Sequence, residues 1–156
     1  MDESSDVRVQ RLTTPKQCLI FARNAHDRDR DDLARQCRHR WVELTAAEHL
    51  GTGEEEEPVD RELWQALAAS EFVLGRNATG TRLAIRRRGL VRAAEQVVCK
   101  GELSTMFTEL DEAGLLEYAW EHVVLRNPDA FSEQARESAQ ARLEAYELHK
   151  DAVEVA

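Results

Sequence analysis

The sequence is poor in the residues that build β-sheets. Only 6% of its residues are aromatic. Alanine, leucine, glutamate and arginine are common instead, and these residues favour helices. Because strands are enriched in aromatic and β-branched residues, the composition predicts an all-α protein. A length of 156 residues fits one ordinary domain or two small helical units that share a core.

Cysteines are few, and long apolar runs are missing. The three cysteines, Cys18, Cys37 and Cys99, are an odd number without Cys-x-x-Cys spacing, so they indicate a reducing compartment. No apolar run reaches the roughly 18 residues of a membrane span. The opening residues MDESSDVR lack the basic and then apolar stretches of a secretory signal. We therefore expect a cytoplasmic protein that does not contact a membrane.

Among the charged residues of the sequence, acidic residues outnumber basic ones. Charged residues make up 33% of the chain, and the formal net charge is −9. Such a balance favours solubility and repels a polyanion at long range. Any contact with DNA or RNA must therefore be made by a local cluster of positive charge.

The first third of the chain predicts a helical hairpin. Residues 1–13 are polar and show no apolar period, so we expect a flexible arm there. Thr14 and Gln17 form a Thr-x-x-Gln capping box, and two amphipathic helices follow within residues 14–50. Their apolar stripe is narrow, so the hairpin needs a partner surface on this chain or on another protein.

The segment GTGEEEEP, residues 51–58, marks the clearest change in composition. Two glycines, four like charges and a proline predict a linker. Residues 59–148 then have the pattern of a helical core domain, and residues 149–156 are expected to be a tail. The whole chain should hold about six or seven helices.

Local signals place the boundaries of the core helices. Asp60 can cap the first core helix, with Val59 and Trp64 as a hydrophobic staple. A later helix is expected over residues 115–126, and Ser132 can cap the last one.

Six arginines and no acidic residue stand between Phe72 and Ala94. They are Arg76, Arg82, Arg86, Arg87, Arg88 and Arg92. A continuous helix through this stretch would turn Arg86 and Arg87 towards the core, where unpaired guanidinium groups are costly. We therefore predict a break at Gly89, with a short arginine-rich turn or helix before it and an amphipathic helix after it.

Three interpretations of these arginines remain open. They can pair with carboxylates of the chain itself, such as Glu54, Glu55, Glu56 and Glu57. They can contact nucleic-acid phosphates, or they can bind an acidic protein. The order of helix, glycine turn and helix is also that of a helix-turn-helix. However, Ile85 and Glu95 stand where that motif prefers a small and a buried apolar residue, so backbone contacts are expected rather than base readout.

No local motif indicates catalysis, a metal or a cofactor. Cys18 and Cys37 lie on the predicted apolar stripes, where free cysteine acts as a small hydrophobe. The nearby histidines lack the paired spacing of a zinc site. His122 has the pattern of a packed helical residue. We therefore predict no catalytic residue, metal ligand or cofactor, although a catalytic site dispersed over the chain would leave no motif.

Two functional hypotheses follow. The first is a non-enzymatic accessory module of an intracellular complex that contacts nucleic-acid phosphates. Its contacts would be Arg82, Arg86, Arg87 and Arg88, with Arg76 and Arg92 at the rim. The second is an interaction module or inhibitor that docks on a basic protein through its acidic exterior, including Glu54 to Glu57, and through the hairpin stripe. An enzyme with a dispersed site is a third and weaker hypothesis.

Overall fold

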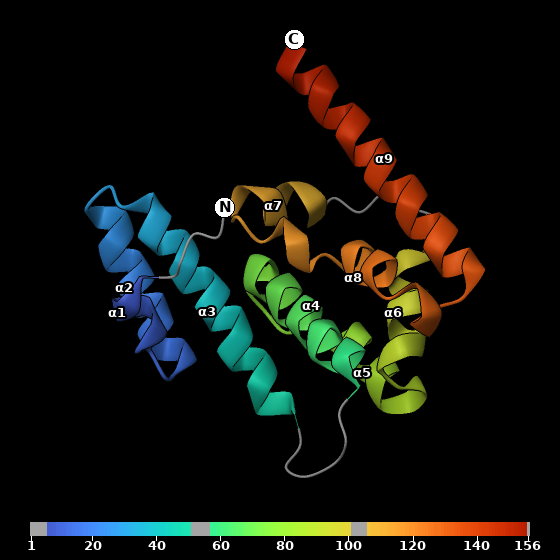
Figure 1. The fold of residues 1–156 in the computed structure, drawn as a ribbon, viewed down its shortest axis with the longest axis horizontal. Helices are drawn as coiled ribbons and strands as arrows, with labels where there is room; N and C mark the ends of the chain where they lie inside the picture. The colour runs from blue at the N-terminus through green and yellow to red at the C-terminus, as the bar shows by residue number, and fades with distance from the viewer. Residues whose placement is uncertain (1–5, 51–56, 101–105, 156) are drawn as a thin grey trace.

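The computed structural model describes residues 6–50, 57–100 and 106–155, and it is helical in all three ranges (Figure 1). These ranges contain nine α-helices, two short 3-10 helices and no strand. The α-helices are α1 (Val7–Gln10), α2 (Pro15–Asp27), α3 (Asp31–His49), α4 (Pro58–Leu74), α5 (Thr79–Arg88), α6 (Leu90–Val98), α7 (Met106–Glu112), α8 (Trp120–Arg126) and α9 (Glu133–Val155). The all-α prediction is confirmed.

Helix α1 lies where the sequence predicts a flexible arm. The Asp6 side chain caps this helix by accepting a hydrogen bond from the Arg8 amide. Val9 is fully buried, and the Asp6 amide donates to Oε1 of Gln36 on α3 at 2.7 Å. Residues 6–10 are therefore anchored to the hairpin. One buried valine cannot form a periodic apolar pattern, so the sequence does not predict this helix.

Helices α2 and α3 form the predicted hairpin. The capping box is present, with the Gln17 amide donating to Oγ1 of Thr14 at 3.2 Å. Cys18 and Cys37 are fully buried, as their positions on the apolar stripes predict. Burial raises the pKa of the Cys37 thiol to about 11, with a smaller contribution from Cys18, so this thiol is protonated at neutral pH.

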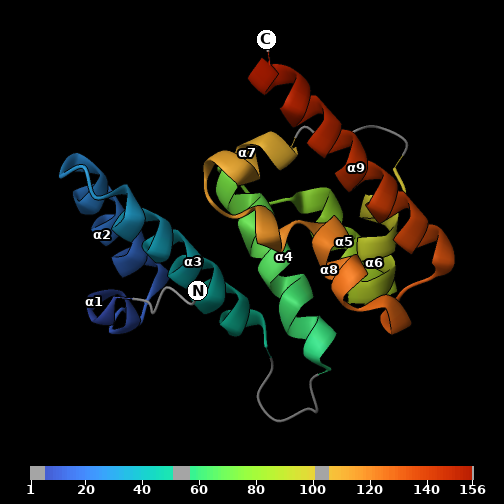
Figure 2. The same ribbon diagram turned by 45° about the horizontal axis from the view of Figure 1, so that its top comes forward.

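The hairpin packs directly on α4 through α3 (Figures 1 and 2). Val42 of α3 belongs to the same buried cluster as Ala68 and Ala69 of α4. The Trp41 and Phe72 rings meet edge to face at 5.2 Å. The narrow apolar stripe of the hairpin therefore packs against another helix of the same chain.

Helix α4 is the centre of the molecule and contributes to two buried clusters. Leu63 and Leu67 pack in the first cluster, with residues of α6, α8 and α9. Ala68 and Ala69 pack in the second, with α3 and α7. The helix begins at Pro58, after Glu57, so Asp60 lies in its first turn and is not the cap. Pro58 explains the earlier start, since proline fits the first helical position.

Two further boundaries differ from the predictions. Residues 115–126 are not one helix, because the chain is extended at Ala119, between the 3-10 helix Leu116–Tyr118 and α8. Ser132 caps α9 as predicted, its hydroxyl accepting from the Ala135 amide at 3.2 Å. However, α9 continues through the expected tail to Val155, and its second half projects beyond the other helices (Figures 1 and 2).

Candidate nucleic-acid interface

Two glycines shape the arginine-rich part of the chain. Gly75 ends α4 with a φ of 69°, and Gly89 separates α5 from α6 with a φ of 89°. Both values lie in the left-handed region that glycine adopts without strain. The predicted break at Gly89 is therefore confirmed, and α5 and α6 form a corner beside the start of α4 (Figures 1 and 2).

Arg82 is held inside this corner by Glu71 of α4. Its Nε and Nη2 atoms donate to the two carboxylate oxygens of Glu71, each at 2.6 Å. Glu71 is 8% exposed and also accepts from the Ala78 amide at 2.7 Å. Burial opposes ionisation of Glu71, but Arg82 and the Ala78 amide outweigh it, so the pKa of Glu71 is lowered. Arg82 therefore joins α4 to α5, and its guanidinium group is already paired with a carboxylate of the chain itself.

The other five arginines of the stretch are exposed. They are Arg76 in the α4–α5 turn, Arg86, Arg87 and Arg88 in the last turn of α5, and Arg92 in the first turn of α6. We call these five residues the arginine corner. Within the described parts of the chain, no carboxylate forms an ion pair with any of them. Arg88 donates to Oε1 of Gln96, a neutral acceptor, at 3.3 Å.

The corner presents its charge in several directions. Consecutive helical residues point about 100° apart, so Arg86, Arg87 and Arg88 spread around the end of α5. Cations at a helix C-terminus also interact favourably with the helix dipole, which helps this turn to tolerate three adjacent positive charges. The arrangement can therefore contact an anionic chain from more than one side. Each guanidinium can bind a phosphate with two parallel hydrogen bonds.

A cavity of about 380 Å³ opens beside the corner. Its lining residues come from the end of α3, from α4 and from α5, and they are His49, Trp64, Arg82, Ile85 and Arg86. We call this cavity the α5 pocket. The His49 and Trp64 rings stack at 4.4 Å with an interplanar angle of 8°. Arg86 belongs to both the pocket and the arginine corner. The sequence pattern does not reveal this site, because its walls come from separate helices.

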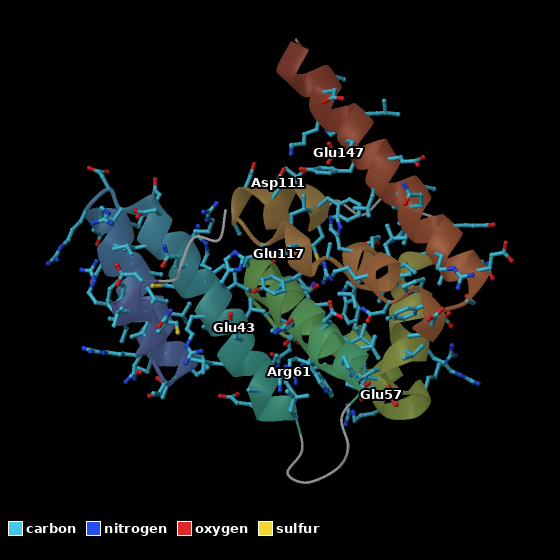
Figure 3. The ribbon with its side chains drawn as sticks, viewed as in Figure 1. Glu43, Glu57, Arg61, Asp111, Glu117 and Glu147 are labelled. Carbon is cyan, nitrogen blue, oxygen red and sulfur yellow. The ribbon has the colours of Figure 1, made fainter. Side chains whose placement is uncertain are left out.

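The acidic residues proposed for partner binding are mostly outside the described residues. Glu54, Glu55 and Glu56 fall there, whereas Glu57 is exposed at the start of α4 (Figure 3). The structure therefore describes no pairing between this acidic segment and the arginine corner.

A second hollow, of about 480 Å³, lies between α8 and the projecting half of α9. Its acidic side chains are Glu144, Glu147 and Asp151, and Glu147 is seen on the projecting part of α9 in Figure 3. Its apolar side chains include Leu143 and Leu148, and Leu148 is 71% exposed. We call this hollow the α9 groove. The spacing of residues 144, 147 and 151 places them on one helical face. This acidic face can be predicted from the sequence only if the last helix is assumed to extend past residue 148.

In the described ranges, no three His, Cys, Asp or Glu side chains are placed to share a metal ion. His122 is partly buried, and this burial lowers its pKa, with Arg126 acting in the same direction. Likewise, none of the helices in these ranges combines the length and the apolar character needed to cross a membrane.

The described residues form an all-helical fold that carries a local cationic surface, the arginine corner. Comparisons of the chain with protein-family models, curated proteins and solved structures found no significant match.

Proposed function

We propose that this protein is a non-enzymatic helical module of an intracellular complex that contacts the backbone of nucleic acid through the arginine corner. The observation that carries the proposal is the set of five exposed arginines without a described carboxylate partner, in a chain of net charge −9. Arg82 is left out of the binding set, since Glu71 holds it.

The charge distribution determines what kind of binding is expected. The acidic remainder of the molecule repels a polyanion, so the corner must act at short range. Contacts between guanidinium groups and phosphates release counterions, and affinity then falls as salt rises. Binding should depend little on base sequence, because phosphates carry no sequence information directly.

Fluorescence anisotropy with labelled DNA and RNA, at two salt concentrations, tests this proposal. The R86A/R87A/R88A variant should bind more weakly to every sequence, with the salt slope reduced by about one unit per lost phosphate contact. The matched control R11A/R23A/R28A removes the same charge from exposed positions around the hairpin. Equal weakening by both variants would mean that net charge, and not the corner, governs binding. Absence of binding by the wild type at low salt would refute the proposal.

A second candidate function is the docking of a basic protein segment in the α9 groove. Three carboxylates beside Leu143 and Leu148 support it, because they match a helix with alternating apolar and cationic faces. A synthetic lysine–leucine amphipathic peptide should bind the wild type in calorimetry, and E144Q/E147Q/D151N should abolish this binding. The control E48Q/E133Q/E137Q changes the same charge at exposed carboxylates outside the groove. If both variants bind the peptide equally, the groove is not the docking site.

A further inference from the structure

The α5 pocket combines an aromatic wall, an apolar wall and a cation. His49 and Trp64 provide the stacked rings, and Ile85 provides the aliphatic surface. Arg86 stands at the pocket as an exposed guanidinium without a described carboxylate partner. Among the described residues, no acidic side chain lines the pocket. The pocket residue Arg82 is paired with Glu71, and both carboxylate oxygens of Glu71 accept a hydrogen bond from it.

This combination matches the chemistry of a nucleobase joined to a phosphate. Proteins that bind single strands pair aromatic or apolar surfaces for the bases with cations for the backbone. A volume of about 380 Å³ is at the small end of ligand pockets, which suits one base better than an extended ligand. Arg86 can reach the phosphate of the same nucleotide, because it borders the pocket and also belongs to the arginine corner.

A pocket that receives one base would distinguish between forms of nucleic acid. Bases within a duplex are paired and stacked, so their faces are not available to a protein pocket. A single strand offers unpaired bases whose faces can leave the stack at small cost. Both forms could make phosphate contacts at the corner, whereas the single strand alone could place a base in the pocket.

We infer that the α5 pocket receives one unpaired base of a single-stranded nucleic acid, with Arg86 on the adjoining phosphate. This inference rests on the proposed function, since it assigns the substrate class of the same surface. It predicts that the protein binds a single strand more tightly than a duplex of equal length.

The test compares three ligands: oligothymidylate, oligouridylate and a duplex of the same length. The wild type should bind both single strands at least about fivefold more tightly than the duplex, the lower range expected for one stacked base. His49→Ala removes one wall of the pocket and should reduce this ratio towards one while leaving duplex binding unchanged. Ile85→Phe, which puts a larger side chain at the pocket lining, should do the same. It serves as the second variant if His49→Ala does not fold.

Tryptophan fluorescence gives a direct readout. Quenching by oligothymidylate should be strong in the wild type and largely lost in Trp64→Phe, while Trp41 and Trp120 remain as the internal background. Thymidine monophosphate should quench only weakly, because it lacks the neighbouring phosphates that contact the corner. If it binds as tightly as the oligonucleotide, the pocket belongs to a free nucleotide and the inference is wrong.

The outcomes separate the two proposals. Equal affinity for single strand and duplex, with both weakened in R86A/R87A/R88A, would overturn the inference and leave the arginine corner as the binding surface. Absence of binding to all three ligands at low salt would overturn both. A single-strand preference that persists in both pocket variants would place base contacts elsewhere and would also overturn the inference.

Discussion

At the scale of residues, one buried carboxylate separates two arginines that the sequence presents as alike. Arg82 and Arg86 are four residues apart on α5 and both line the α5 pocket. Glu71 binds Arg82 through two hydrogen bonds, whereas Arg86 has no described carboxylate partner. Arg82 therefore joins α4 to α5, whereas Arg86 is exposed at the end of α5.

The first prediction follows from this difference. Arg82→Ala leaves the buried Glu71 carboxylate with a single amide donor, and it should lower the free energy of unfolding by about 2 kcal/mol. Arg86→Ala removes only an exposed charge and should change this free energy by less than about 0.5 kcal/mol. Urea denaturation of both variants measures the difference. Equal effects would show that the pair with Glu71 contributes no more than an exposed side chain.

The pH dependence of the free energy of unfolding provides a control for the Arg82–Glu71 pair. The folded-state pKa of Glu71 is below its ordinary value, so the unfolded chain binds more protons in acid. The stabilisation is therefore present at neutral pH and is lost as the pH falls through the folded-state pKa. The stability difference between the wild type and Arg82→Ala should shrink in acid. A difference that stays constant down to about pH 3 would point to lost packing instead of lost charge pairing.

The predictions for single residues were correct where they depended on the periodic spacing of apolar residues along a helix. Cys18 and Cys37 are buried because their spacing places them on the apolar stripes. The partner of Arg82 was not predictable in this way, since Glu71 is on another helix and was one of many acidic residues in the chain. The sequence raised pairing with internal carboxylates as an alternative. Only the three-dimensional arrangement identifies Glu71 as the partner.

At the scale of elements, glycine conformation sets the angle between α5 and α6. Gly89 has a φ of 89°, whereas Gly80, inside α5, is in ordinary helical backbone, and a Cβ would meet no atom within 4 Å at either position. Space is therefore not the constraint at either glycine. Backbone conformation alone distinguishes them.

The second prediction uses these two glycines as a matched pair. Gly89→Ala forces an L-residue into left-handed backbone and should lower the free energy of unfolding by about 1 to 2 kcal/mol. Gly80→Ala replaces glycine within a helix and should raise it by up to about 1 kcal/mol. Thermal denaturation followed by circular dichroism measures both changes. A shift of the same sign in the two variants would contradict this account of the corner.

Element boundaries were predictable where the chain carries a strong local signal. The capping box at Thr14, the break at Gly89 and the cap at Ser132 are such signals, and all three are present. The break at Ala119 was not predictable, since alanine favours a helix and tertiary packing overrides that preference. The buried clusters around Trp120 and Tyr118 lie on either side of this break.

At the scale of the whole molecule, the two candidate surfaces carry opposite charges and lie on different elements. The arginine corner occupies the α4–α5–α6 region, and the acidic α9 groove lies between α8 and the projecting half of α9. Composition reveals the overall negative charge but not this separation, because the two surfaces are assembled by folding. The candidate arginines were therefore predictable from the sequence as a cluster. The pocket beside them and the groove on α9 were not.

The hairpin and the core should unfold together, which is the third prediction. The sequence divides them at residues 51–58, yet Val42 of α3 shares a buried cluster with Ala68 and Ala69 of α4. A shared core makes separate unfolding of the hairpin unfavourable, because it would expose apolar surface on both sides. Variants that keep only Trp41 or only Trp120 report on the hairpin contact and on the core, respectively.

In each of these variants, the denaturation midpoint from fluorescence should equal the midpoint from circular dichroism. Val42→Ala should lower the free energy of unfolding by about 2 kcal/mol, and both tryptophan probes should report the same change. If the Trp41 transition precedes that of Trp120, the hairpin is an independent unit joined mainly through the linker. Its apolar stripe would then be free to meet another protein, which would strengthen the interaction hypothesis over the nucleic-acid one.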